Sequence, residues 1–205
     1  MSTDNQKKWP TAVFALGLIC GSLSGIGHAT ASPNSTLLLA GGCNICHGPN
    51  GVSSGPATPT IAGLSGEYLL STLEGFKSGE IPSTIMGRIT RGYSSDELQA
   101  LANHYSSRPF SASQQPYDPR LARQGAKLHN KYCEKCHTEG GSSAEEGTGR
   151  LAGQWRPWLI WALQDFRSGR RLAGRKMQQQ LDKLYIRKGK RGLTALLHYY
   201  ASQQP

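Results

Sequence analysis

The sequence has very few cysteines, and almost none is free for a disulfide. Only five occur in 205 residues. Four of them lie in two short motifs, "CNICH" (43–47) and "CEKCH" (133–137), and the fifth is Cys20. Small exported domains commonly rely on disulfides. Here such a framework would have no cysteines to use outside the two motifs and the N-terminal leader described below.

Several other patterns are missing. No segment alternates apolar and polar residues as a strand does, so we expect an all-α fold. No G-x-G-x-x-G follows a strand, which excludes a dinucleotide-binding domain, since "GSLSGIG" (21–27) lies in the leader. No Ser/His/Asp set or carboxylate pair is arranged for acid–base chemistry. We therefore predict no catalytic residue, and the polypeptide is not expected to be an enzyme by itself.

The first 31 residues have the organisation of a secretory signal peptide. Lys7 and Lys8 precede the apolar run "TAVFALGLIC" (11–20), and "ATA" (29–31) supplies a small-residue cleavage site. The apolar run is too short and too rich in Gly and Ser nearby to span a bilayer comfortably. We therefore expect export to the periplasm with cleavage near Ala31, and no stable membrane insertion afterwards.

The remaining chain repeats itself. "IAGL" (61–64) returns 90 residues later as "LAGQ" (151–154), and "ALANHY" (100–105) returns 95 residues later as "ALLHYY" (195–200). The change of offset places a small insertion in the second copy. Two tandem copies of one unit are therefore expected.

The repeat predicts two helical domains, residues 36–110 and 120–205, joined by a linker at 111–119. Three signals predict where helices begin. Ser94 and Glu97 can form a capping box, a second helix is expected to begin near Asp118, and Pro157 fits the first turn of a third. One helical face is formed by Leu98, Leu101, Ala102 and Tyr105. Domains this small bury little of their own surface and would gain from a large apolar object at their centre.

The two Cys-x-x-Cys-His motifs indicate covalent haem. Cysteines at i and i+3 of a helical turn face one side, and the next residue, His, can bind iron held there. A zinc site would need cysteine pairs 90 residues apart to meet, and a thioredoxin-like site would need a βαβ unit. We therefore predict two covalently bound haem c groups. Their attachment residues are Cys43, Cys46, Cys133 and Cys136, and their iron-binding histidines are His47 and His137.

Methionine is as scarce as cysteine. After the leader only Met86 and Met177 remain, 39 residues after His47 and 40 after His137. Matching places in the repeat favour axial ligation over core filling. His/Met ligation fills both axial positions, so such a haem transfers electrons and does not activate oxygen or hydrogen peroxide. Three other histidines could compete to bind the iron: His104, His129 and His198. We expect them to be ordinary packing or surface residues instead.

Supporting groups are expected around each haem. The Nδ1–H of a ligating histidine normally donates to a carbonyl, and Pro56 or Pro59 lies near the right place in the first copy. The aromatic residues expected to pack on the macrocycles are Tyr68, Phe76, Trp155, Trp158, Trp161 and Phe166.

The charge is concentrated in one half. Residues 32–110 carry 4 Lys and Arg against 5 Asp and Glu, whereas residues 111–205 carry 17 against 7. Nucleic acid is an unexpected partner for an exported chain. The basic half fits either a docking face for an acidic protein or a solvated surface without a partner.

These motifs resemble class I cytochromes c in tandem. Nearly the whole mature chain is most similar to the diheme cytochrome subunit of flavocytochrome c sulfide dehydrogenase. The segments that carry this resemblance are Cys43–Tyr105, with the string "PSTIMGRITRGYS" around Met86, "CEKCHTEGGSSAEEGTGRLAGQW" (133–155) and "HYYASQQ" (198–204). In that family a separate FAD-containing subunit oxidises sulfide, and electrons pass through the diheme subunit to a soluble acceptor cytochrome c. The resemblance implies the ligand set given above and a heterodimer with FAD only in the partner.

Two alternatives remain open. The Cys, His and Met positions alone also fit a free diheme shuttle to a terminal oxidase, of the kind whose domains share the "AGQ…DF.SG" pattern. A diheme peroxidase would need one open iron position, which methionine in both copies argues against.

Overall fold

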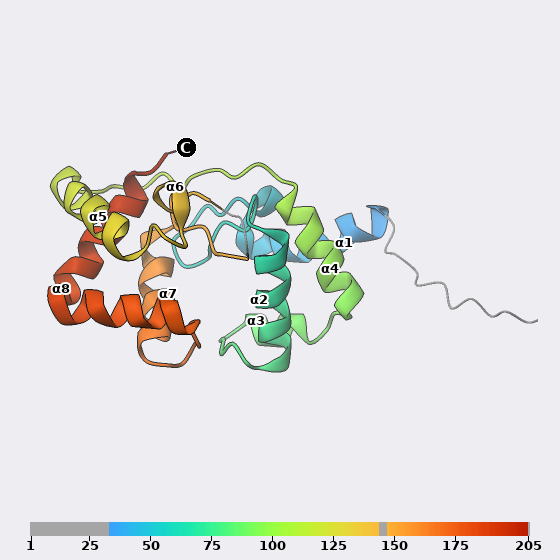
Figure 1. The fold of residues 1–205 in the computed structure, drawn as a ribbon. Helices are drawn as coiled ribbons and strands as arrows, with labels where there is room; N and C mark the ends of the chain where they lie inside the picture. The colour runs from blue at the N-terminus through green and yellow to red at the C-terminus, as the bar shows by residue number, and fades with distance from the viewer. Residues whose placement is uncertain (1–32, 144–146, 205) are drawn as a thin grey trace, which may run out of the picture.

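The computed structural model describes residues 33–143 and 147–204, and this part of the chain forms helices and no strand. Figure 1 shows two groups of helices, α1 to α4 and α5 to α8. The elements are α1 (Pro33–His47), the 3₁₀ helix η1 (Pro49–Gly51), α2 (Gly66–Ser78), α3 (Met86–Thr90), α4 (Ser95–Ser106), α5 (Pro119–Tyr132), α6 (Thr138–Gly141), α7 (Arg156–Arg167) and α8 (Arg175–Ser202). The predicted all-α fold is confirmed. The predicted signal peptide, residues 1–31, lies outside the described residues.

The helices begin where the sequence signals place them. Ser94 and Glu97 form the expected capping box, with the Glu97 N–H donating to the Ser94 hydroxyl at 3.2 Å and the Ser94 N–H donating to the Glu97 carboxylate at 2.7 Å. The Asp118 carboxylate caps α5, and Pro157 lies in the first turn of α7. None of the described helices combines the length and apolar character needed to cross a bilayer.

Each group of helices has its own small core. In the first, the predicted face of α4 is buried and packs with residues of α1 and α2 such as Ala40 and Leu69. In the second, Leu196 and Tyr200 of α8 take the equivalent place and pack with Leu159 of α7. Matching core positions on matching helices are what an internal repeat predicts.

The two copies differ in how the last helices are built. The first copy uses the short α3, a turn and then α4, whereas α8 covers the same stretch as 28 residues. Gly189 interrupts α8 with φ 58° and ψ −155°, a backbone conformation that a residue with a Cβ adopts at a cost. The insertion read from the sequence lies between Met177 and Ala195, so it is absorbed within this longer helix.

A buried glutamine connects the two halves. The Gln154 side chain is fully buried; its amide NH₂ donates to the Thr60 carbonyl at 2.7 Å, and its carbonyl accepts the Thr60 N–H at 3.0 Å. The indole of Trp155 donates to the Ser53 carbonyl at 3.1 Å. Because Thr60 is itself fully buried, its backbone groups need such partners in place of water.

Replacing Gln154 with Ala should destabilise the protein by about 2–4 kcal/mol, because two buried backbone groups of Thr60 lose their partners. Denaturant unfolding measures the effect. The control is Gln124→Ala, an exposed position on α5, which should change the stability by less than about 0.5 kcal/mol. Equal unfolding midpoints for the two variants would show that the Gln154 contact does not stabilise the protein.

Candidate functional site

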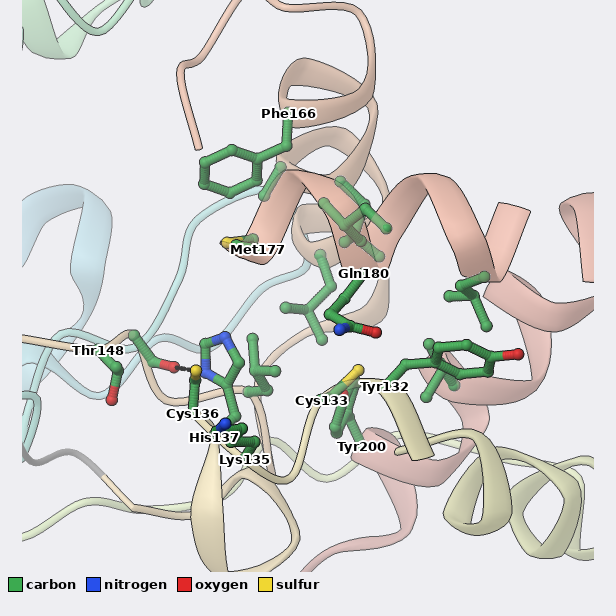
Figure 2. A pocket seen from close by; sticks show the side chains of 18 of the residues that line it. Tyr132, Cys133, Lys135, Cys136, His137, Thr148, Phe166, Met177, Gln180 and Tyr200 are labelled. Carbon is green, nitrogen blue, oxygen red and sulfur yellow. Dashed lines mark hydrogen bonds between the residues drawn. The ribbon is translucent and has the colours of Figure 1, made fainter. Parts of the chain in front are cut away.

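The second half contains a cavity of about 540 Å³. Its walls come from the end of α5, the "CEKCH" segment, the loop 147–151, α7 and α8, with Tyr68 reaching in from the first half. Four sequence-predicted residues line it: Cys133, Cys136, His137 and Met177. Figure 2 shows Met177 on α8 across the cavity from His137, with both cysteines on the histidine side.

Local backbone geometry puts the motif side chains on one side. α5 ends at Tyr132, and the N–H groups of Cys136 and His137 both donate to the Cys133 carbonyl, at 3.1 and 2.9 Å. This turn brings the two cysteines and the histidine to the same wall. The first copy achieves the same within α1, which runs through Cys43 to His47.

The thiols are free and are not tuned for disulfide exchange. All four motif cysteines are unpaired. Burial raises the pKa of the Cys43 and Cys133 thiols, whereas redox-active Cys-x-x-Cys pairs have a lowered thiol pKa. The described residues also form no strand, so the βαβ unit that a thioredoxin-like site needs is not found among them.

Both motif histidines are held in the same way. The Nδ1 of His47 lies 2.9 Å from the Pro59 carbonyl, and the Nδ1 of His137 lies 3.1 Å from the Gly149 carbonyl. A carbonyl only accepts, so Nδ1 donates and Nε2 keeps its lone pair. Burial lowers the pKa of both imidazoles, which favours the neutral form that binds metals. The predicted Pro59 contact is confirmed.

The rival histidines have other partners. Both nitrogens of His129 are engaged, Nδ1 with the Tyr200 hydroxyl at 3.0 Å and Nε2 with Glu134 at 2.5 Å. His198 accepts the Asp118 N–H at 2.9 Å, and His104 packs on the edge of Tyr105. The expectation that these histidines pack or lie at the surface is confirmed.

The sequence did not reveal the network around His129. In the first copy the matching tyrosine, Tyr105, donates to Asn44 and to the Ala40 carbonyl, both at 3.0 Å. The second copy replaces this neutral contact with the Glu134–His129–Tyr200 chain. The recurring tyrosine at the end of "ANHY" and "LHYY" was the only signal of it.

The structure places Met177 in a cavity with its motif histidine but, among the described residues, shows no such contact for Met86. Met177 is half-buried and lines the cavity with His137. Met86 is half-buried at the first residue of α3, where its carbonyl accepts the Thr90 hydroxyl at 2.9 Å. The described contacts do not join Met86 to His47, so the first ligand pair stays a prediction.

The predicted aromatic wall is present in part. Tyr68, Trp158 and Phe166 line the cavity. Trp161 is 49% exposed, and Trp155 instead binds the first half through its indole N–H. Neither Trp155 nor Trp161 belongs to the cavity lining, so the expectation is not confirmed for these two residues. For Phe76 of α2 it stays a prediction.

The donor set of the cavity fits haem. Two thiols can form thioethers, an imidazole nitrogen and a thioether sulfur can bind iron from opposite sides, and aromatic residues surround them. The volume falls within the range of about 300–1,000 Å³ typical of ligand sites. The two cysteine pairs lie in different halves, and in the described part of the chain no three His, Cys, Asp or Glu side chains are grouped to hold a metal ion.

The surroundings of the two motifs differ in charge. Between the cysteines the first copy has Ile45, which is 85% exposed, and the second has the exposed Lys135. On the Met177 side of the cavity, Arg171 and Lys176 belong to the lining. The lining of the second site therefore includes several basic side chains.

Comparison with known proteins finds relatives of two kinds: some match about 70 residues, the length of one copy, and others match over both copies. Cytochrome c-554(548) of Halomonas halodenitrificans is 30% identical over 70 residues, which are 33% of this chain and 84% of that protein. The cytochrome subunit of sulfide dehydrogenase of Chlorobaculum tepidum is 39% identical over 70 residues, 34% of this chain and 63% of that protein. No protein-family model matches the chain.

Two relatives that match over both copies are named cytochrome c4. Cytochrome c4 of Pseudomonas aeruginosa is 29% identical over 163 residues, covering 75% of this chain and 80% of that protein. The crystal structure of reduced cytochrome c4 from Pseudomonas stutzeri superposes with a TM-score of 0.71 and 25% identity, covering 85% of this chain and all of that one. The chain therefore has the fold of that protein.

Proposed function

Because the chain belongs to the c-type cytochromes, we propose that it is a diheme electron-transfer protein that acts in the periplasm. Cys43, Cys46, His47 and Met86 would hold one haem, and Cys133, Cys136, His137 and Met177 the other. The observation that carries the proposal is the meeting of Cys133, Cys136, His137 and Met177 in a single cavity. Residues 36–110 and 120–205 would each form one haem domain, with 111–119 as the linker.

The protein's own groups suit this role. A haem with His and Met on its iron exchanges single electrons between Fe(III) and Fe(II), and the soft sulfur favours Fe(II). The Pro59 and Gly149 carbonyls fix the two imidazoles, and burial keeps both imidazoles neutral. With a ligand on each side of the iron, neither site would admit a substrate, which argues against a peroxidase.

We further propose that the electrons come from an FAD-containing sulfide dehydrogenase subunit and leave to a soluble cytochrome c. The similarity of one copy to a cytochrome subunit of sulfide dehydrogenase supports this donor. The second candidate is a free diheme shuttle to a terminal oxidase. It is favoured by the relatives that match over both copies, which are named cytochrome c4.

Purification of the native protein distinguishes the two candidates. We expect an intact mass that exceeds the mature polypeptide by two haems, and co-elution with a yellow FAD-containing chain at equal stoichiometry. A stable free monomer with two haems would establish the shuttle instead. A colourless product with the mass of its amino acids alone would remove both proposals.

Met86→Ala and Met177→Ala should each open one iron to carbon monoxide and lower the reduction potential of that haem, because the sulfur ligand is lost. Carbon monoxide difference spectra of the reduced variants measure the opening. Met→Ala at one position should leave the other haem unchanged. If a variant binds no carbon monoxide, its methionine is not the ligand.

The basic second half should dock the acceptor, while the near-neutral first half meets the flavoprotein. Replacing Arg170, Arg171 and Arg175 with Gln should slow reduction of an acidic acceptor cytochrome about tenfold at low salt and weaken its salt dependence. The control replaces Arg120, Arg123 and Lys127 of α5, all exposed, with Gln. An unchanged rate in the first variant, measured by stopped flow, would place the acceptor elsewhere.

A further inference from the structure

Arg150 lies where the second cavity meets the first half of the protein. It follows Gly149, whose carbonyl holds His137, and it belongs to the lining of the cavity. The ring of Phe110, from the segment between α4 and α5, covers one face of its guanidinium at 3.9 Å from the ring centroid. Arg150 thus contacts Phe110 of the first half and also lines the cavity of the second.

Within residues 33–143 and 147–204, no group forms a hydrogen bond or a salt bridge with the Arg150 guanidinium. Its Nε is buried and makes no hydrogen bond. Neither of the salt bridges found among the described residues involves Arg150. Burial lowers its pKa, and the charge of Glu139, which makes no hydrogen bond to it, only partly opposes this. A half-buried cation that has no ion-pair partner among the described residues is unfavourable, so we look to the cavity for an anion.

We propose that Arg150 binds a propionate carboxylate of the haem at the second site. This inference rests on the proposed function. Propionates are the anionic side chains of haem, and a guanidinium presents paired N–H donors that match a carboxylate. Since Arg150 adjoins Gly149, one short loop would both orient the ligating imidazole and bind an acidic group of the cofactor.

The first copy lacks this feature. The residue 90 positions before Arg150 is Thr60, whose N–H and carbonyl are both bonded to Gln154. The two haems would therefore lie in different electrostatic environments, because only the second copy has an arginine at this position of the repeat. A cation beside the second haem favours its reduced state, because reduction adds negative charge. Arg150 is then a residue that raises the potential of the second haem relative to the first.

Arg150→Gln tests the proposal in the mature diheme protein. We expect one of the two midpoint potentials to fall while the other stays. At the original midpoint the ratio of reduced to oxidised second haem should fall about tenfold, which is ~59 mV for a one-electron couple. Optical redox titration measures both haems. Arg150→Lys keeps the charge without the paired donors and should give a smaller fall.

The control is Arg123→Gln, which removes the same charge from an exposed position of α5 outside the cavity lining and should leave both potentials in place. If Arg150 merely supports Phe110, Arg150→Gln lowers the melting temperature but moves neither potential, and the proposal is overturned. If Arg150→Gln does not mature, Arg150→Lys decides: an unchanged potential overturns the proposal. Absence of haem from the unaltered protein would instead reject the proposed function itself.

Discussion

The hydrogen bond between each motif histidine and a carbonyl twelve residues later is the contact on which both sites depend. It fixes the imidazole tautomer, leaves Nε2 free for a metal, and fastens the loop that closes each site. Because the same spacing occurs in both copies, it belongs to the repeated unit. The residues used, Pro59 and Gly149, differ completely, since a carbonyl is the only group required.

Much of the fold could be predicted from local signals. The capping box at Ser94, the cap at Asp118 and the buried face of α4 depend on residues a few positions apart, which the sequence displays directly. The kinked α8 could not be predicted in this way. Its course depends on Gly189, and nothing in the sequence distinguishes a glycine that ends a helix from one that interrupts it.

The residues of the candidate site and the Pro59 contact could be predicted from the sequence, but the other supporting contacts could not. Cys133, Cys136, His137 and Met177 could be assigned because each recurs in the repeat, and the structure brings these four to one cavity. The Glu134–His129–Tyr200 chain and the Gln154–Thr60 pair occur in one copy or between copies, so the repeat gives no sign of them. Long-range polar contacts follow from packing, which single-sequence patterns do not encode.

The contact between the halves also joins the two candidate sites. Pro59 holds His47, and the next residue, Thr60, is bonded to Gln154. Gln154 in turn follows closely after Gly149, which holds His137. A shift of one half against the other would therefore disturb both histidine carbonyls at once. This short, fully buried connection makes the interface between the halves a part of both candidate sites.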